Sequence, residues 1–191
     1  MKSEEILARE VRKNKTGAVE ELYDRYAPML LGICMRYCGN RQDAEDVLHD
    51  GFIKILKHLH TFKARSSGSF EGWIRRIIVN TALNWLRDNS QNRRFLEIDP
   101  VRERIPDEPD EVDSWEDLHE LIGEEEIMHM ICELPPGYRT VFNLYVFEDY
   151  SHKEIAEQLQ FSESTSKSQL SKARALLRKK ISEVLEKQKV G

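Results

Sequence analysis

An acidic segment that contains three prolines interrupts this chain of 191 residues near its middle. Residues 97–126 hold 14 acidic and 2 basic side chains. The prolines of the segment are Pro100, Pro106 and Pro109. Like charges and prolines in one stretch are typical of a solvated linker, because neither packs easily into a core. The sequence therefore predicts two domains, over residues 1–92 and 115–191, joined by an acidic linker over residues 93–114.

The net charge of −5 conceals an uneven distribution. Residues 1–96 hold 17 basic and 12 acidic side chains, and residues 127–191 hold 10 and 8. Two mildly basic blocks thus flank the acidic segment. The acidic balance of the whole chain therefore does not exclude nucleic acid as a partner.

Composition excludes several classes of protein. Hydrophobic residues make up 40% of the chain and charged residues 33%, which is too apolar for disorder throughout. No apolar run approaches the roughly 18 residues of a membrane span, and the first ten residues lack the apolar stretch of a signal peptide. Three cysteines without a secretion signal favour a reducing compartment. We therefore expect a cytoplasmic protein with no membrane insertion.

The sequence carries no motif for catalysis. It has no glycine-rich phosphate loop and no Ser/His/Asp or Cys/His arrangement that indicates a nucleophile. Cys34 and Cys38, with His58 and His60, imitate a zinc site, but both cysteines lie within an apolar stripe and are expected in the core. We therefore expect no catalytic residue, no cofactor and no metal ion.

Apolar residues of the first domain recur at intervals of three and four, which indicates amphipathic helices. We expect the first helix to end at Gly39-Asn40, the next to be capped by Asp43, and a loop to cover residues 61–69. The inward positions of the three helices are Val19, Leu22, Tyr23, Tyr26, Met29, Leu30, Ile33, Cys34, Tyr37 and Cys38; Val47, Leu48, Phe52, Ile55, Leu56 and Leu59; and Phe70, Trp73, Ile74, Ile77, Ile78 and Leu86.

The second domain is predicted to be helical too, which makes the expected fold class all-α. Helical spacing begins at Trp115, and Pro136 suits the first turn of a new helix. Ser151 and Glu154 fit a capping box, and Ser162 fits the cap of a helix that runs to about Lys187. A short capped helix, a three-residue turn and a longer basic helix predict a helix-turn-helix.

The last helix has the composition of a helix that enters the major groove of DNA. Slim polar side chains near its start suit base edges, and cations further along suit phosphates. The residues concerned are Ser164, Thr165, Lys167, Ser168, Ser171, Lys172, Arg174 and Arg178. The alternative is a solvated basic helix that closes a bundle.

Two further charged surfaces are predicted in the first domain. Asp43, Asp46 and Asp50 share one face of the second helix, which suits an arginine-rich partner, although a plain solvated face is the alternative. On the third helix, cations surround exposed amides and aromatic rings, a combination that suits single-stranded DNA. The residues of this second surface are Arg75, Arg76, Asn80 and Arg87, and the alternative for Asn80 is an exposed amide without a function.

Four stretches in this order and spacing resemble the extracytoplasmic-function (ECF) sigma factors, initiation factors of bacterial RNA polymerase that belong to the sigma-70 superfamily. They read EELYDRY at 20–26; DAEDV at 43–47 with GFIK at 51–54; FEGWIRRI at 70–77 with Asn80, Leu86 and Arg87; and LPP at 134–136 with EIA at 154–156, TSKS at 165–168 and KAR at 172–174. The resemblance implies sigma region 2 and sigma region 4 as the two domains.

The resemblance also implies partners for these surfaces. Core RNA polymerase would be bound through its large-subunit clamp coiled coil and its flap, with Asp43, Asp46, Asp50 and Phe52 at the coiled coil. An anti-sigma factor is a further expected partner. The acidic linker would thread through the polymerase interior toward the RNA exit channel.

Promoter DNA is the remaining partner that the resemblance implies. The loop with Lys63 and Arg65 would capture a flipped base of the melted −10 element, together with Asn80. The start of the last helix would bind the −35 duplex. Ser166 stands where the family usually has a branched apolar residue, and Gln169 where it usually has an arginine. The promoter preference is therefore not carried over from the family.

Two other functions fit parts of the sequence. A stand-alone helix-turn-helix regulator would bind specific duplex DNA without polymerase. A recombinase-like DNA enzyme would need a mixed α/β catalytic domain, and residues 1–92 show no convincing alternation of strands. Of these three functions, we expect that of a sigma factor.

Overall fold

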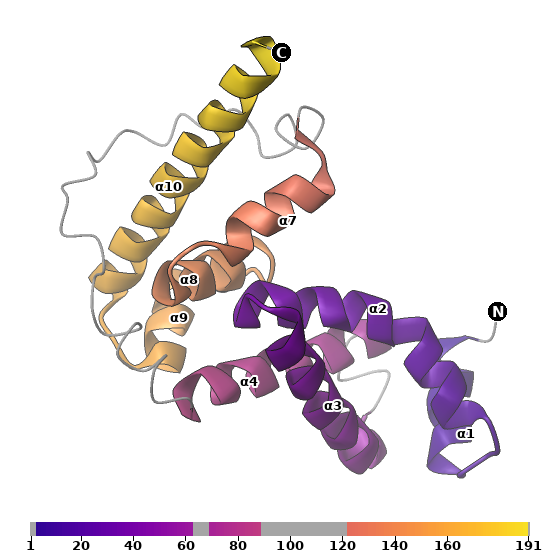
Figure 1. The fold of residues 1–191 in the computed structure, drawn as a ribbon. Coiled ribbons are helices and arrows are strands. Elements are labelled where there is room, and N and C mark those ends of the chain that lie inside the picture. The colour runs from indigo at the N-terminus through magenta and orange to yellow at the C-terminus, as the bar shows by residue number, and fades with distance from the viewer. Residues whose placement is uncertain (1–2, 63–68, 89–121, 191) are drawn as a thin grey trace. The chain divides into compact units, whose positions relative to one another are not determined.

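The computed structural model describes residues 3–62, 69–88 and 122–190, and the chain divides into two compact units, Met1–Asn89 and Ser90–Gly191 (Figure 1). Every element in the described residues is a helix, which confirms the all-α prediction. The predicted linker over 93–114 lies outside the described residues, as does most of the predicted loop over 61–69. The predicted domain limits therefore stay predictions.

The first unit is built on three long helices. Its elements are α1 (Glu4–Arg12), α2 (Ala18–Cys38), α3 (Arg41–His58), the short 3₁₀ helix η1 (Leu59–Thr61) and α4 (Phe70–Asp88). Helices α2, α3 and α4 pack against one another, and α1 packs against α2 and η1 (Figure 1). No strand occurs among the described residues of this unit, so the part of the chain that a recombinase-like enzyme would need as an α/β domain is helical.

The core of the first unit includes most of the positions that the periodicity predicted. Gly51 of α3 is buried, and a Cβ atom there would collide with the side chain of Ile78 on α4, so glycine allows the two helices to approach closely. Three predicted core positions are wrong: Val19 is 43% exposed, Tyr23 47% and Leu56 37%. They lie at the border of the packed face, where the helical period alone does not decide between core and surface.

Helix α1 was not anticipated from the sequence. It buries Leu7, Ala8 and Val11 against the rest of the first unit. One face of a nine-residue helix gives only a short periodic signal, and such a helix is marginal in isolation. Its stability therefore comes from contacts with distant parts of the chain.

Two charged side chains of α1 make such distant contacts. The Tyr26 hydroxyl donates to Oε1 of Glu4 at 3.1 Å, and the backbone N–H of Phe70 donates to Oε2 at 3.2 Å. The guanidinium of Arg12 donates to the carbonyls of Leu59 and Phe62, at 3.0 and 2.6 Å. Helix α1 therefore holds both the end of η1 and the start of α4.

The junction between α2 and α3 differs in one detail from the prediction. Gly39 ends α2 with a φ of 79°, as a glycine at this position allows. Asn40, not Asp43, caps α3: its side chain accepts the backbone N–H of Asp43 at 2.9 Å. Asp43 lies in the first turn, where its carboxylate accepts from the Asn40 side chain and is favoured by the helix dipole.

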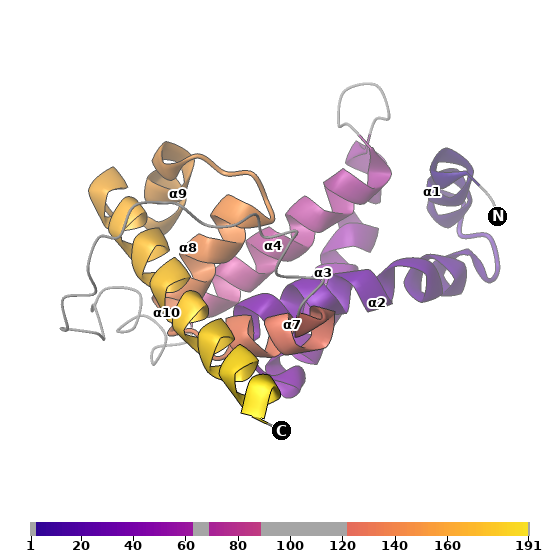
Figure 2. The same cartoon turned by 90° about the horizontal axis from the view of Figure 1, so that it is seen from above.

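The second unit contains α7 (Glu124–Cys132), α8 (Pro136–Val146), α9 (His152–Leu159) and α10 (Glu163–Val190). Pro136 begins α8, as predicted. Helix α10 packs along α7, α8 and α9 (Figure 2). The predicted helical residues 115–121 lie outside the described part. None of the described helices of the chain combines the length and the apolar character needed to cross a membrane.

Candidate nucleic-acid interface

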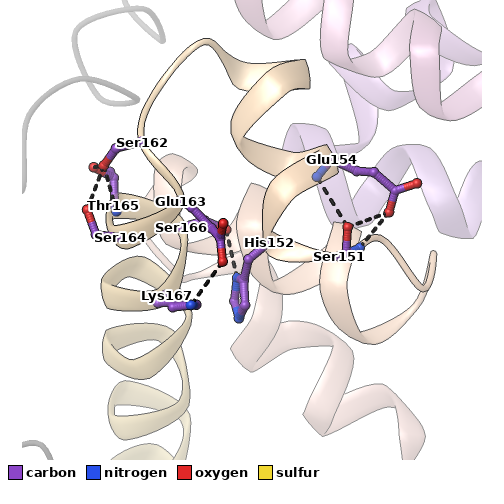
Figure 3. Close-up of polar contacts among 9 residues, drawn as sticks. All are labelled: Ser151, His152, Glu154, Ser162, Glu163, Ser164, Thr165, Ser166 and Lys167. Atoms are coloured by element: carbon purple, nitrogen blue, oxygen red, sulfur yellow. Dashed lines mark hydrogen bonds and ion pairs between the residues drawn. The ribbon is translucent and has the colours of Figure 1, made fainter.

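Helix α9 begins with the capping box that the sequence predicted. The backbone N–H of Glu154 donates to the Ser151 hydroxyl at 3.3 Å, and the backbone N–H of Ser151 donates to the Glu154 carboxylate at 2.8 Å (Figure 3). Hydrogen bonds from the hydroxyl and the backbone of Ser151 lower the pKa of Glu154. The start of the first helix of the motif is therefore fixed by its own sequence.

The turn between α9 and α10 covers residues 160–162. Gln160 adopts the left-handed conformation with a φ of 60°, and the backbone N–H of Phe161 donates a hydrogen bond to the carbonyl of Ala156 at 3.2 Å. The Ser162 hydroxyl then accepts the backbone N–H of Thr165 at 3.1 Å, as expected for the cap of α10. The predicted helix-turn-helix is confirmed.

Helix α10 separates an inner from an outer face over its first four turns. The inner positions, all buried, are Ser166, Gln169, Leu170, Ala173 and Leu177. Of the residues predicted to bind DNA, the exposed ones are Ser164, Lys167 and Ser168, and the half-buried ones are Thr165, Ser171, Lys172, Arg174 and Arg178. Every predicted DNA-binding position of this helix therefore lies outside the buried core.

Several of these side chains already have partners within the chain. The ammonium of Lys167 lies 2.9 Å from the Glu163 carboxylate, and this pair lowers the pKa of Glu163 (Figure 3). The hydroxyls of Ser164 and Thr165 each lie 2.8 Å from the Ser162 hydroxyl. A DNA contact by these residues would therefore rearrange or extend an existing network.

A hydrogen bond between α9 and α10 was missed by sequence reasoning. Nδ1 of His152 lies 2.9 Å from Oγ of Ser166, which is fully buried (Figure 3). The imidazole also stacks on Tyr145 of α8, with ring centroids 4.7 Å apart and an interplanar angle of 25°. The only signal in the sequence was the serine at 166, which departs from the usual apolar residue of the family.

Two of the three aspartates predicted to form an acidic face on α3 are exposed. Asp46 and Asp50 are exposed, whereas Asp43 is half-buried beside the Asn40 cap. Phe52 is only 6% exposed, and its ring lies 4.7 Å from that of Tyr23. Phe52 is therefore buried, as its place in the apolar period predicted, and its part in the polymerase-binding surface stays a prediction.

Helix α4 presents a mixed face of cations, an amide and an aromatic ring. Trp73, Arg76, Asn80 and Arg87 recur at helical spacing; Arg76 and Asn80 are exposed, and Trp73 and Arg87 are half-buried. Arg75, also half-buried, lies 3.9 Å from Glu71. The Arg87 guanidinium donates to the side chain of Asn84.

The start of α4 carries an aromatic cluster formed by Phe62, Phe70 and Trp73, with centroids 5.1 to 5.8 Å apart. Phe62 and Phe70 border the segment that contains the predicted DNA contacts Lys63 and Arg65. Those two residues lie outside the described part of the chain. The cluster therefore brings Phe62 and Phe70 together.

The cysteines behave as predicted. Cys34 and Cys38 are buried, and burial raises the pKa of Cys34 to about 12. Within residues 3–62, 69–88 and 122–190, no three His, Cys, Asp or Glu side chains form a group that suits a metal ion.

Two family models match the chain, one on each unit. The model described as Sigma-70 region 2 matches residues 22–92, and the model described as Sigma-70, region 4 matches residues 124–177. Their order is that of the two helical units, and the second match includes the whole α9–turn segment and the start of α10. The chain belongs to the ECF sigma factors of the sigma-70 family.

Curated relatives match this sigma factor over nearly its whole length. The ECF RNA polymerase sigma-E factor of Haemophilus influenzae is 28% identical over 94% of this chain and 95% of its own length. The RNA polymerase sigma factor YlaC of Bacillus subtilis is 27% identical over 91% of this chain and 97% of its own. A solved structure of CnrH in complex with the cytosolic domain of CnrY covers 93% of this chain and 96% of the solved chain, at 21% identity and a TM-score of 0.47. The chain is a promoter-recognising sigma factor, with RNA polymerase and promoter DNA as its partners.

Proposed function

We propose that this sigma factor reads the −35 duplex through the first turns of α10 and the melted −10 strand through α4 and the segment before it. The observation that carries the proposal is the helix-turn-helix, which leaves Ser164, Lys167 and Ser168 exposed at the start of α10. Helix N-termini offer free backbone N–H groups, and short side chains admit the helix to the major groove. Lys172 and Ser171 then lie one turn further along.

The proposed phosphate contacts lie beyond the readout positions. Arg174 and Arg178 follow on α10, and the Arg174 guanidinium lies 5.7 Å from the centre of the Tyr145 ring. On α4, Asn80 and Arg76 are exposed at a spacing of one helical turn, which supports a contact with an unstacked base and its backbone.

The proposed polymerase contact is the acidic face of α3. Exposed Asp46 and Asp50 support docking on an arginine-rich surface, which the family resemblance assigns to the clamp coiled coil of the large subunit. The flap of polymerase and an anti-sigma factor complete the proposed partners. The proposed location is the cytoplasm, and the chemistry of transcription belongs to polymerase rather than to this chain.

The −35 assignment is tested by separating base readout from phosphate binding. Arg178→Ala is expected to lower the salt dependence of binding by roughly one log–log unit and to weaken all −35 sequences by the same factor. Lys172→Ala is expected to cost about 1–3 kcal/mol at particular base pairs only. Both are measured by titrating holoenzyme against promoters with single −35 substitutions at several salt concentrations.

The matched control is Lys187→Ala, an exposed lysine near the far end of the same helix. It is expected to behave as the unmodified protein does. If Arg178→Ala and Lys172→Ala each lower the affinity for every promoter by the same factor, α10 contacts only the DNA backbone and the proposed base readout is wrong.

A further inference from the structure

The first turns of α10 are held against α9 by a polar contact inside the motif. Oγ of Ser166 and Nδ1 of His152 lie 2.9 Å apart, and Ser166 is 0% exposed. A buried hydroxyl without a partner is costly, so this hydrogen bond strongly favours the rotation of α10 that brings Ser166 to His152. The contact is made in the same orientation of the helix that buries Leu170, Ala173 and Leu177.

The imidazole is itself held in place from a third helix. It stacks on Tyr145 of α8, and the Arg174 guanidinium of α10 lies near the same tyrosine ring. His152 is also the first residue of α9, directly after the Ser151 cap. The hydrogen-bond partner of Ser166 is therefore fixed by its stacking and by the capped start of its helix.

The charges around His152 favour its neutral form. Burial lowers its pKa, as do the nearby cations Lys167 and Arg174, whereas Glu163 opposes them. A neutral imidazole retains an acceptor nitrogen, which the Ser166 hydroxyl can use. The electrostatics of the motif thus agree with a hydrogen bond that persists near neutral pH.

The position of Ser166 determines what α10 presents on its opposite face. Successive residues of an α-helix turn by roughly 100°, so residues 164 and 168 lie about 160° away from residue 166. Those positions are the exposed Ser164 and Ser168. An error of about 10–20° in side-chain direction is enough to lose a well-formed contact.

We propose that His152 and Ser166 form a polar latch that sets the rotation of α10 and makes both side chains positioning residues for discrimination among −35 sequences. The inference rests on the proposed function of α10. It adds two residues that touch each other and need not touch DNA.

The latch is tested in holoenzyme with three variants. Ser166→Ala removes the hydroxyl at little change in volume, and His152→Phe keeps a ring to stack on Tyr145 but removes the nitrogen. Each is expected to lower the ratio of affinities for the preferred −35 sequence and its single-base variants by about threefold to tenfold, as the loss of one hydrogen bond to a buried group allows. The salt slope is expected to stay unchanged, because no phosphate contact is lost.

The third variant combines His152→Phe with Ser166→Val. It replaces the polar pair by an apolar one, and it is expected to recover discrimination relative to the single variants. Ser182→Ala, an exposed serine further along α10, is the matched control and is expected to discriminate as the unmodified protein does.

The outcomes separate the latch from the function on which it rests. Unchanged discrimination in Ser166→Ala and His152→Phe overturns the latch, as does an equal loss of affinity for every sequence, which would indicate a merely structural bond. If unmodified holoenzyme itself fails to discriminate among −35 sequences, the proposed readout by α10 fails first.

Discussion

At the scale of single residues, His152 couples the stability of the second unit to pH. Its pKa lies below the ordinary value of 6.5, because of burial and the cations Lys167 and Arg174. The unfolded chain therefore binds this proton more tightly than the folded one. The stabilisation is present above pH 6.5 and is lost as the pH falls from there through the pKa of the folded state.

We therefore expect the free energy of unfolding to decrease as the pH falls below 6.5, and the decrease to be smaller in His152→Gln. Urea unfolding at several pH values measures it. An identical slope in His152→Gln and the unmodified protein would contradict the expectation.

Local sequence decides some residue contacts and leaves others open. The caps Ser151 and Ser162 were predictable, because each side chain bonds a backbone group only three residues away. Asn40 and Asp43 are both good caps three residues apart, and the backbone geometry selects Asn40. The bond from His152 to Ser166 spans 14 residues and two helices, so no local rule predicts it.

At the scale of elements, the acidic face of α3 leads to a test of polymerase binding. Asp46→Arg combined with Asp50→Arg is expected to abolish retention by core polymerase, because like charges across an interface cost several kcal/mol. Glu5→Arg with Asp24→Arg makes the same change of charge at exposed positions of the same unit and is expected to retain binding. A pull-down with core polymerase measures retention. Retention of a folded variant with both substitutions, Asp46→Arg and Asp50→Arg, would contradict the assignment of polymerase binding to this face of α3.

Helix α1 leads to a second expectation at this scale. Glu4→Ala leaves the hydroxyl of Tyr26 and the N–H of Phe70 without this acceptor, and is expected to lower the free energy of unfolding by about 1–3 kcal/mol. Glu4→Gln keeps an acceptor oxygen, and its free energy of unfolding is expected to decrease less. Urea unfolding measures both, with Glu5→Ala at an exposed neighbouring position as the control. Equal stability of Glu4→Ala and Glu5→Ala would show that the bonds contribute nothing net.

The long helices were predictable because their apolar period extends over many turns, as in α2 and α3. Helix α1 was not, since its partners Leu59, Phe62 and Phe70 are far away in the sequence. The dependence on contacts distant in the sequence also explains why the ring contacts of Phe52 were not predictable. Its place on α3 was predictable, but whether its ring faces the core or a partner depends on Tyr23 of another helix.

At the scale of the whole molecule, the distribution of charge predicts how the free chain responds to DNA. Seven acidic residues lie in 107–117: Asp107, Glu108, Asp110, Glu111, Asp113, Glu116 and Asp117. Replacing them by Asn and Gln changes the net charge from −5 to +2. Binding of the free chain to non-specific duplex DNA is then expected to strengthen several-fold at low salt, because repulsion of the phosphates is reduced.

Fluorescence anisotropy with a labelled random duplex measures this change. The gain is expected to shrink as salt is raised, since screening removes interactions between distant charges. A gain that is absent at low salt, or that persists at high salt, would contradict an electrostatic origin.

The bond from Glu4 to Phe70 also has a consequence for the synthesis of the chain. Its two ends are 66 residues apart, so translation at about 5–20 residues per second separates them by roughly 3 to 13 seconds. During that interval the buried face of α1, with Leu7, Ala8 and Val11, has no complete surface to pack against. Helix α1 can therefore complete its contacts only after Phe70 has been translated, and slow codons between residues 12 and 70 would lengthen the time for which its apolar face is incompletely covered.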